Sequence, residues 1–284
     1  MSAPATPGAG TLFVVATPIG HLGDLSPRAA EVLRTVDAVA AEDTRRTARL
    51  FAHLGVPAPS LLSLPAFDER GRIAAIVARL ASGQSVALCT DAGTPGVSDP
   101  GVALVEAAWE AGARVVPVPG PSAALAALMA SGLAADRFLF AGFLPRKGGG
   151  RAEALGWLAA VPATLVLYEA GNRTLETLVD LHAALGDRPA AVARELTKLH
   201  EEVLRGPLSG LPARLPDPVR GEVTIVVGGA PAPPAPAATE PLEVELGRRL
   251  AAGDPPTAVA REVARARGLR RADVYAALER LKRG

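Results

Sequence analysis

Short apolar runs recur between residues 11 and 227, and longer stretches of mixed apolar and polar residues separate most of them. Runs of this length bounded by Gly, Pro, Asp or Ser are typical of buried strands, and the stretches between them are typical of helices. We expect strands at Thr11–Ala16, Ala38–Ala41, Val86–Cys89, Arg114–Val118, Thr164–Leu167, Ala190–Ala193 and Val223–Val227. This alternation predicts α/β layers.

Helix boundary signals lie in several of the intervening stretches. We expect helices at Pro27–Thr35, Arg72–Ala81, Pro100–Ala111 and Thr174–Leu185. Ser26-Pro27 and Asp99-Pro100 each place an N-cap residue before a proline at the first helical position. Gly112 suits the end of the helix that follows Pro100.

The chain changes character after residue 230. The segment PAPPAPAA, within a predicted linker at 231–239, cannot pack a core and is expected to be semi-rigid. A helical unit is expected at 240–284, where Asp254-Pro255 opens one helix and Gly268 separates it from a second. Two helices joined by such a turn resemble a helix-turn-helix, but they are equally typical of a helical hairpin docked on the body of the protein.

Composition narrows the function classes. The chain is 49% hydrophobic and 21% charged, which is typical of a compact soluble protein, and its 4% aromatic content disfavours a base-stacking platform. The net charge is +1, but the segment from Thr239 onward holds ten Lys/Arg and seven Asp/Glu. No apolar run is long enough to span a membrane, the N-terminus does not resemble a signal peptide, and Cys89 is the single cysteine. We therefore expect a cytoplasmic protein without internal disulfides.

Several familiar sites are missing from the sequence. No G-x-G-x-x-G follows a strand, and there is no P-loop or G-x-S-x-G motif, which disfavours dinucleotide, P-loop and serine-hydrolase sites. His200-Glu201-Glu202 begins like a zinc-protease motif, but Leu204 stands where the second histidine is needed. We expect no metal site built by the chain alone, although Mg²⁺ held partly by a bound ligand would leave no such trace.

The most informative loops follow two neighbouring apolar runs. One covers Thr90–Gly101 and the other covers Pro119–Ser122, and both are rich in small and turn-forming residues. Such loops at the carboxyl ends of buried strands are where open α/β sheets bind ligands. Polar or charged segments follow four further runs, at 15–26, 42–46, 168–173 and 194–198. Together they predict one ligand cleft, and the alternative is a set of ordinary strand–helix turns.

Eight sequence blocks carry a family resemblance. In chain order between about residues 11 and 229 they are TPIGHLGDLSPRA, AEDTRRT, CTDAGTPGVSDPG, VPVPGPSA, FAGFLPRK, YEAGNR, RELTKLHEE and GEVTIVVGG. In this set the chain resembles the small-subunit ribosomal RNA methyltransferase I family of the tetrapyrrole-methylase superfamily. The EDTR, DAGTPGVSDPG and PGPSA blocks distinguish that family from porphyrin-modifying relatives. The chain departs from it at Ala170-Gly171, where members often have another dipeptide.

The resemblance implies S-adenosylmethionine-dependent 2′-O-methylation of a cytidine ribose in the decoding centre of 16S ribosomal RNA. It also implies a homodimer and two α/β lobes, at 11–118 and 119–230, with the cofactor in the cleft between them. The implied cofactor contacts are Pro18, Asp91, Ala92, Gly93, Thr94, Val97, Ser98, Ser122, Ala123, Glu169 and Leu196. Of these, Pro18 belongs to the first strand-end loop, which bounds the substrate side.

Proton removal from the ribose hydroxyl leaves several candidates. Asp43, Glu195 and Lys198 are candidate bases, and Arg45 or Arg194 would hold a phosphate or orient a carboxylate. Glu195 and Asp43 are preferred, but the sequence does not rank them firmly.

Basic residues predict where RNA would bind. The segment 138–147, followed by three glycines and an arginine, is expected to be a mobile basic lip or an ordinary surface loop. The phosphate-binding candidates are Arg146, Lys147 and Arg151 there, and Arg270 and Arg271 in the helical unit.

Two other functions fit part of the sequence. A tetrapyrrole carbon methyltransferase would use the same cofactor but methylate a tetrapyrrole and not RNA. A nucleic-acid-binding regulator would act through the C-terminal helices and use the rest of the chain as a sensor.

Overall fold

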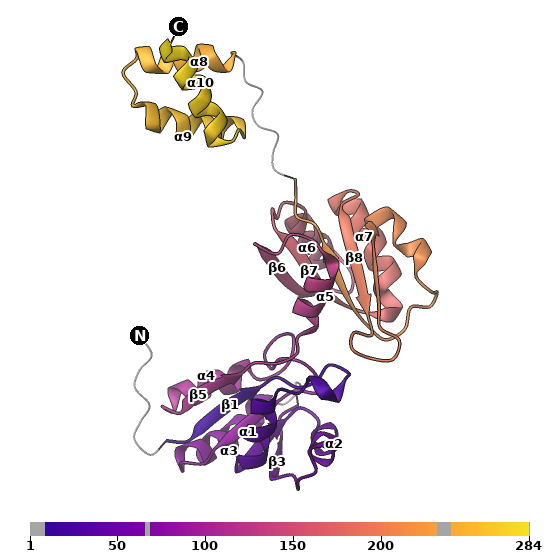
Figure 1. The fold of residues 1–284 in the computed structure, drawn as a ribbon. Helices are drawn as coiled ribbons and strands as arrows, with labels where there is room; N and C mark the ends of the chain where they lie inside the picture. Colours follow the sequence, from indigo (N-terminus) through magenta and orange to yellow (C-terminus); the bar gives the residue numbers. More distant parts are fainter. Residues whose placement is uncertain (1–8, 66–68, 232–239, 284) are drawn as a thin grey trace. The chain divides into compact units, whose positions relative to one another are not determined.

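The computed structural model describes residues 9–65, 69–231 and 240–283 (Figure 1). The chain divides into two compact units, Met1–Ala230 and Pro231–Gly284. The first unit contains two five-stranded sheets with helices packed on them, and the described part of the second unit is helical. This confirms the predicted α/β class with C-terminal helices.

The first sheet is parallel throughout and has the strand order β3-β2-β4-β1-β5. Its strands are β1 (Thr11–Val15), β2 (Ala38–Ala41), β3 (Ser60–Ser63), β4 (Val86–Cys89) and β5 (Arg114–Val118). Because all five run in one direction, their carboxyl ends meet at the same edge of the sheet. The loops that follow β1, β2, β4 and β5 therefore lie together.

Helices cover both faces of the first sheet. They are α1 (Pro27–Thr35), α2 (Thr44–Leu54), α3 (Glu69–Ala81) and α4 (Val102–Glu110), and a 3-10 turn at Leu22–Asp24 precedes α1. Apolar residues of α1 and α2, such as Leu33 and Phe51, pack with Val39 on one face. Residues of α3 and α4, such as Leu80 and Leu104, form a separate core on the other face. This doubly wound arrangement buries the sheet and leaves the loop edge open for a site.

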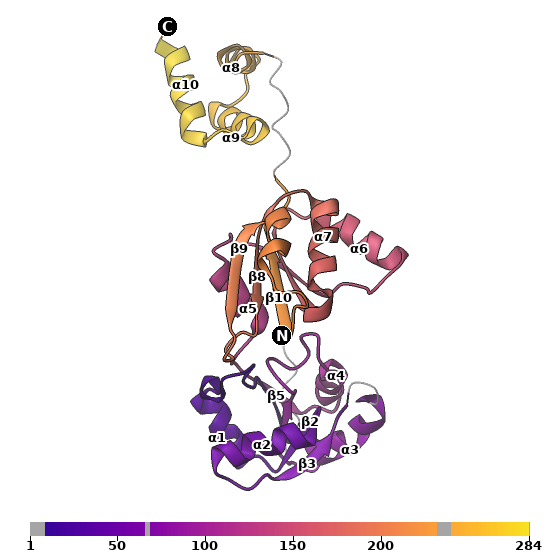
Figure 2. The ribbon, with the colours of Figure 1, turned by 90° about the vertical axis from the view of Figure 1, so that its right-hand side faces the viewer.

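The second sheet is mixed and has the order β6-β7-β10-β8-β9, with β6 parallel to β7 and the other neighbours antiparallel. Its strands are β6 (Phe138–Phe143), β7 (Thr164–Ala170), β8 (Pro189–Arg194), β9 (Glu202–Pro207) and β10 (Glu222–Val227). Helix α5 (Ala123–Ser131) covers one face, and α6 (Gly149–Ala159) and α7 (Thr174–Leu185) cover the other (Figure 2). Three 3-10 turns complete this region, at Gly171–Arg173, Leu208–Gly210 and Pro212–Arg214.

The second unit is built from three helices, α8 (Leu242–Ala251), α9 (Pro256–Arg267) and α10 (Arg271–Arg283). They enclose a core of their own that includes Leu246, Val259, Val263, Val274 and Leu278. The sequence predicted the last two helices and Gly268 between them, which is left-handed in the structure, but it did not reveal α8. None of the helices in the described ranges is both long and apolar enough to cross a membrane.

Two local predictions were wrong. The helix expected from Pro100 begins at Val102, and its cap is Gly101, with φ 128°, rather than the Asp99 side chain. The predicted basic lip is also shorter than expected, because Phe138–Phe143 forms strand β6 and pairs with β7. Only the segment after Phe143 connects β6 to α6 as a loop.

Candidate active site

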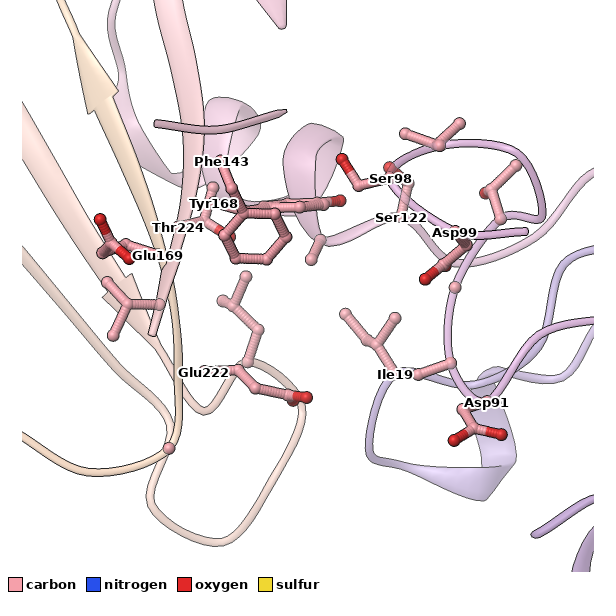
Figure 3. Close-up of a pocket in the computed structure, with 18 of the residues that line it drawn as sticks. Ile19, Asp91, Ser98, Asp99, Ser122, Phe143, Tyr168, Glu169, Glu222 and Thr224 are labelled. Atoms are coloured by element: carbon pink, nitrogen blue, oxygen red, sulfur yellow. The ribbon is translucent and has the colours of Figure 1, made fainter. Parts of the chain in front are cut away.

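A cavity of about 430 Å³ lies at the loop edge of the first sheet and is closed by residues of the second (Figure 3). We name it the central cavity. The first sheet and its loops contribute Ile19, Glu42, Arg46, Asp91, Ala92, Gly93, Thr94, Val97, Ser98, Asp99, Ser122 and Ala123. The second contributes Phe143, Tyr168, Glu169, Ala170, Ala193, Leu196, Gly221, Glu222, Val223 and Thr224.

The loop after β4 forms one wall and is tied to its two neighbours. Backbone hydrogen bonds join Gly93 and Thr17 in both directions, at 2.8 and 3.0 Å, and the Thr94 hydroxyl donates to Pro121 O at 3.2 Å. Gly93 and Gly96 have φ values of 77° and 80°, which suit glycine, and Gly93 lines the cavity without a side chain. The loop therefore presents backbone directly to the cavity.

Acidic residues dominate the charge of the central cavity. Among its described lining residues, five carry carboxylates and Arg46 is the one cation. The Asp91 amide donates to Glu42 Oε2 at 3.2 Å, and Asp91 Oδ2 lies 3.3 Å from Arg46 Nε. Figure 3 shows the Asp99 and Glu222 carboxylates directed inward from opposite walls. Such a cavity favours a cationic ligand.

Asp99 is the most perturbed carboxylate of this group. Burial, followed by the nearby Glu42 charge, raises its pKa to about 6. A cavity-lining carboxyl with a pKa raised in this way is a candidate functional group. Asp99 was not expected at the site because Asp99-Pro100 also matches a helix-start signal. Its position inside the Gly-rich loop was the signal that could have identified it.

The opposite wall is organised around Tyr168 and Glu169 of β7. The Tyr168 hydroxyl accepts a hydrogen bond from Ala124 N at 3.2 Å, and burial raises the pKa of this phenol. Glu169 is 2% exposed, and its carboxylate points away from the cavity in Figure 3. It accepts a hydrogen bond from Thr177 Oγ1 at 2.6 Å and lies 3.4 Å from an Arg173 nitrogen. Glu169 thus forms part of the wall, while Arg173 and Thr177 compensate its charge on the side away from the cavity.

The structure brings together all but one of the predicted cofactor residues. Those that line the central cavity are Asp91, Ala92, Gly93, Thr94, Val97, Ser98, Ser122, Ala123, Glu169 and Leu196. Pro18 instead lines an adjoining cavity of about 450 Å³, which we name the side cavity. The two cavities share Ile19, Arg46, Asp91, Ala92 and Glu222. They therefore form two compartments with a common boundary.

The predicted bases occupy ion pairs. Glu195 Oε1 accepts hydrogen bonds from Lys198 Nζ and from Glu222 N, both at 3.1 Å. Burial acts to raise the pKa of Glu195, but these hydrogen bonds and the nearby Lys198 and His200 charges outweigh it, so the pKa is lowered. Opposing contributions act on Lys198, whose pKa is raised because bonds to Glu222 and Glu195 outweigh burial. Of these two candidates, Lys198 lines the side cavity.

Asp43 is held at the start of α2. Its carboxylate accepts hydrogen bonds from Arg45 Nε and the Arg45 backbone amide, at 3.1 and 2.8 Å. The Arg45 hydrogen bonds lower the pKa of Asp43 to about 2. Asp43 and Arg45 are not among the described residues that line either cavity. Both remain predictions as catalytic residues, but this geometry makes Asp43 a weak base.

The predicted phosphate-binding residues have different surroundings. Arg146 and Lys147 are exposed in the loop between β6 and α6. Arg270 is exposed and paired with Asp273 at 2.9 Å, and the Arg271 guanidinium lies 5.5 Å from the Tyr275 ring centroid.

Arg151 was misplaced by the sequence analysis. It is 6% exposed, and its Nε donates to Asp180 Oδ2 at 2.7 Å. Its other nitrogens donate to Pro145 O at 3.1 Å and to Thr177 Oγ1 at 3.0 Å. Arg151 therefore fastens the loop to α7 instead of presenting its charge to RNA.

Comparisons with known proteins identify the family and the fold. Residues 11–212 match the family model of the Tetrapyrrole (Corrin/Porphyrin) Methylases. A Xylella fastidiosa protein named ribosomal RNA small subunit methyltransferase I is 49% identical over 279 residues, covering 95% of this chain and 99% of the relative. The Synechocystis protein of the same name is 45% identical, with 94% and 96% covered. A Pseudomonas aeruginosa protein of that name is 50% identical, with 79% and 81% covered.

Solved structures show the same fold at lower identity. Uroporphyrin-III-C-methyltransferase from Thermus thermophilus is 24% identical with a TM-score of 0.53, and the match covers 78% of this chain and 92% of that one. Diphthine synthase is 18% identical with a TM-score of 0.62, covering 77% and 90%. By its sequence and its fold, the chain belongs to the ribosomal RNA small subunit methyltransferase I family, within the tetrapyrrole methylases.

Proposed function

We propose that this chain transfers a methyl group from S-adenosylmethionine to the ribose 2′-oxygen of a cytidine in 16S ribosomal RNA. The names of its relatives support a small-subunit ribosomal RNA substrate, and the sequence blocks described above support the 2′-oxygen of a cytidine. The observation that carries the proposal is the acidic central cavity at the carboxyl ends of the parallel strands.

The central cavity fits S-adenosylmethionine in charge, shape and size. The sulfonium is a cation, and the Glu42, Asp99 and Glu222 carboxylates line the cavity. Gly93, which lines the cavity, leaves room on one wall for the cofactor because it has no side chain. The volume of about 430 Å³ lies in the usual range for small-molecule sites, roughly 300–1,000 Å³. The residues that would hold the cofactor are Asp91, Ala92, Gly93, Thr94, Val97, Ser98, Ser122 and Ala123.

Positioning is the main task of the chain in this reaction. Bound S-adenosylmethionine supplies a methyl group that its sulfonium has already activated. The walls of the two cavities must hold the ribose oxygen in line with that methyl group, and alignment of this kind lowers a barrier by up to roughly 7–11 kcal/mol. The shared boundary at Ile19, Asp91 and Glu222 is where the two reactants would meet.

The hydroxyl proton needs an acceptor, and Asp99 joins Glu195, Asp43 and Lys198 as a candidate. A general base works best when its pKa lies near the working pH. The pKa of Asp99 is raised to about 6, whereas that of Asp43 is lowered to about 2 and that of Glu195 is also lowered. By pKa Asp99 is the best matched of the four, although it lines the central cavity and not the side cavity.

The assembly follows from the resemblance, and the location follows from the absence of a signal-peptide pattern and the single cysteine. The proposed state is a cytoplasmic homodimer. Sedimentation of the full chain would give the mass of two copies, and a monomer at micromolar concentration would contradict the dimer.

The decisive experiment measures methyl transfer from labelled S-adenosylmethionine to small ribosomal subunits that lack their native methylations. The RNA is then digested to nucleosides, and uroporphyrinogen III serves as a parallel acceptor. Label in 2′-O-methylcytidine is the expected result. Label in a base-methylated nucleoside would contradict the 2′-oxygen, and label in uroporphyrinogen would identify a tetrapyrrole methyltransferase. If the chain neither binds S-adenosylmethionine nor transfers a methyl group, the remaining alternative is a nucleic-acid-binding regulator.

A further inference from the structure

The side cavity differs from the central cavity in charge. Its described lining residues include three cations, Arg46, Arg49 and Lys198, against the carboxylates of Asp91 and Glu222. The central cavity has the opposite balance: its described lining has one arginine and five carboxylates, of which only Glu169 is turned away and compensated from behind. An anionic group is therefore repelled from the central cavity and attracted to the side cavity, although the two adjoin.

Helix α2 places two of these cations on one face. Arg46 and Arg49 are three residues apart, a spacing that brings helical side chains together. Buried Leu50 and Phe51 anchor the helix to the sheet, so its polar face is fixed at the cavity. Arg46 lines both cavities, and Arg49 lines the side cavity only. The two arginines thus reach from the boundary between the cavities into the side cavity.

No contact in the part of the chain that the structure describes explains why an arginine stands at position 49. Among the described residues its side chain makes no hydrogen bond or ion pair, and it is exposed. Arg45, in contrast, is bound to Asp43. An unpaired guanidinium at a cavity wall is suited to a phosphate, which it can bind through two parallel hydrogen bonds.

We propose that the side cavity receives the methyl-accepting nucleotide of the RNA, with Arg46 and Arg49 binding the phosphodiester beside its ribose. This inference rests on the proposed function. The ribose lies between a phosphate and a base in every nucleotide, so a phosphate held by these arginines places the sugar near the boundary with the central cavity. The side cavity, at about 450 Å³, has the volume of an ordinary small-molecule site.

The test compares the full chain with Arg49→Ala, Arg49→Lys and Arg34→Ala. Arg34 is the matched control, since it is an exposed arginine in the last turn of α1 and lines neither cavity. Methyl transfer is measured against small-subunit concentration at several salt concentrations, and S-adenosylmethionine binding is measured by calorimetry. Filter binding of the same subunits is measured separately.

For Arg49→Ala we expect KM for the subunit to rise about tenfold, with kcat within about twofold of wild type. The salt dependence of subunit binding should fall by roughly one phosphate contact. Cofactor affinity should not change, which also shows that the variant is folded, and Arg49→Lys should recover part of the loss. If Arg49→Ala matches Arg34→Ala in KM and salt dependence, the side cavity does not bind the phosphodiester.

The two proposals fail in different ways. A wild-type chain that binds subunits but transfers no methyl group refutes the proposed function. In that case filter binding of wild type and Arg49→Ala alone tests whether the side cavity binds the phosphodiester. A normal wild-type reaction with an unchanged Arg49→Ala variant refutes only the subsite.

Discussion

Asp99 illustrates how a single carboxyl can be unfavourable for the fold and useful to the site. It is half-buried and lies near other carboxylates, and these surroundings raise its pKa to about 6 from an ordinary value of 3.8. The folded chain therefore disfavours the ionised form of Asp99. Residues placed at such a disadvantage are concentrated at functional sites, where the perturbed pKa serves the chemistry.

Replacing Asp99 with Asn should separate stability from activity. The raised pKa means that ionisation of Asp99 destabilises the fold as pH rises from about 3.8 through about 6. Asp99→Asn cannot ionise, so we expect its Tm to exceed that of wild type at pH 8 by roughly 2–4 °C, the shift that about 1 kcal/mol produces in a protein of this size. Near pH 4 the two Tm values should coincide. Scanning calorimetry at both pH values measures this.

Activity should change in the opposite direction. If Asp99 accepts the proton, Asp99→Asn lowers kcat by about 10²–10⁴-fold, and wild-type kcat declines below a pH of about 6. Glu195→Gln and Asp43→Asn, measured beside it, show whether a predicted base has the larger effect. A normal kcat for Asp99→Asn would assign the proton to one of those groups, to solvent or to the RNA.

At the scale of elements, the loop between β6 and α6 is fastened by a buried network. Arg151 joins the loop at Pro145 to Asp180 and Thr177 of α7, and Thr177 in turn donates to Glu169 in the cavity wall. The exposed Arg146 and Lys147 thus lie on a loop whose base is fixed. The network connects this surface to the second sheet's side of the active site.

Arg151 and Lys147 should therefore behave differently when each is replaced with Ala. We expect Arg151→Ala to lower the free energy of unfolding by roughly 2–3 kcal/mol, below the range for fully buried pairs, because Asp180 is 35% exposed. Lys147→Ala should leave stability unchanged and reduce the salt dependence of RNA binding by about one contact. Urea unfolding and binding titrations measure the two effects. A stable Arg151→Ala variant with a reduced salt dependence would restore Arg151 as a phosphate ligand.

The strands that the sequence analysis missed share a physical cause. Strands β3, β6 and β9 lie at sheet edges, and most of their residues are only partly buried or exposed. They lack the continuous apolar run of a central strand such as β4, which is buried throughout. The central strands were predictable because burial on both faces dictates their composition, whereas helices α2, α5, α6 and α8 were not among the expected ranges.

The site was predictable only in part for a related reason. Strand-end loops identified the cleft, and the family resemblance supplied the residues that line it. Pairings between distant residues leave no local pattern, so the partner of Arg151, Asp180, could not be read from the sequence. The same holds for Asp99, whose pKa depends on Glu42 brought close by the fold.

In the whole molecule, we expect the two units to have different roles in the proposed reaction. All residues of the central and side cavities belong to the first unit. The second unit has its own apolar core, and exposed arginines occupy its surface, including Arg261, Arg265, Arg270 and Arg271. Cofactor binding should therefore depend on the first unit alone, and the second unit should add affinity for RNA.

A chain ending at Ala230 tests this division. We expect it to bind S-adenosylmethionine within about twofold of the full chain, because every cavity residue is retained. Its affinity for small ribosomal subunits should fall, and the salt dependence should decrease by roughly one unit for each lost phosphate contact. The double variant Arg270→Ala/Arg271→Ala in the full chain is the control that assigns the loss to these arginines. Loss of cofactor binding on truncation would place part of the cofactor site in the second unit. Unchanged subunit binding would remove that unit from RNA recognition and favour a docking role for its helices.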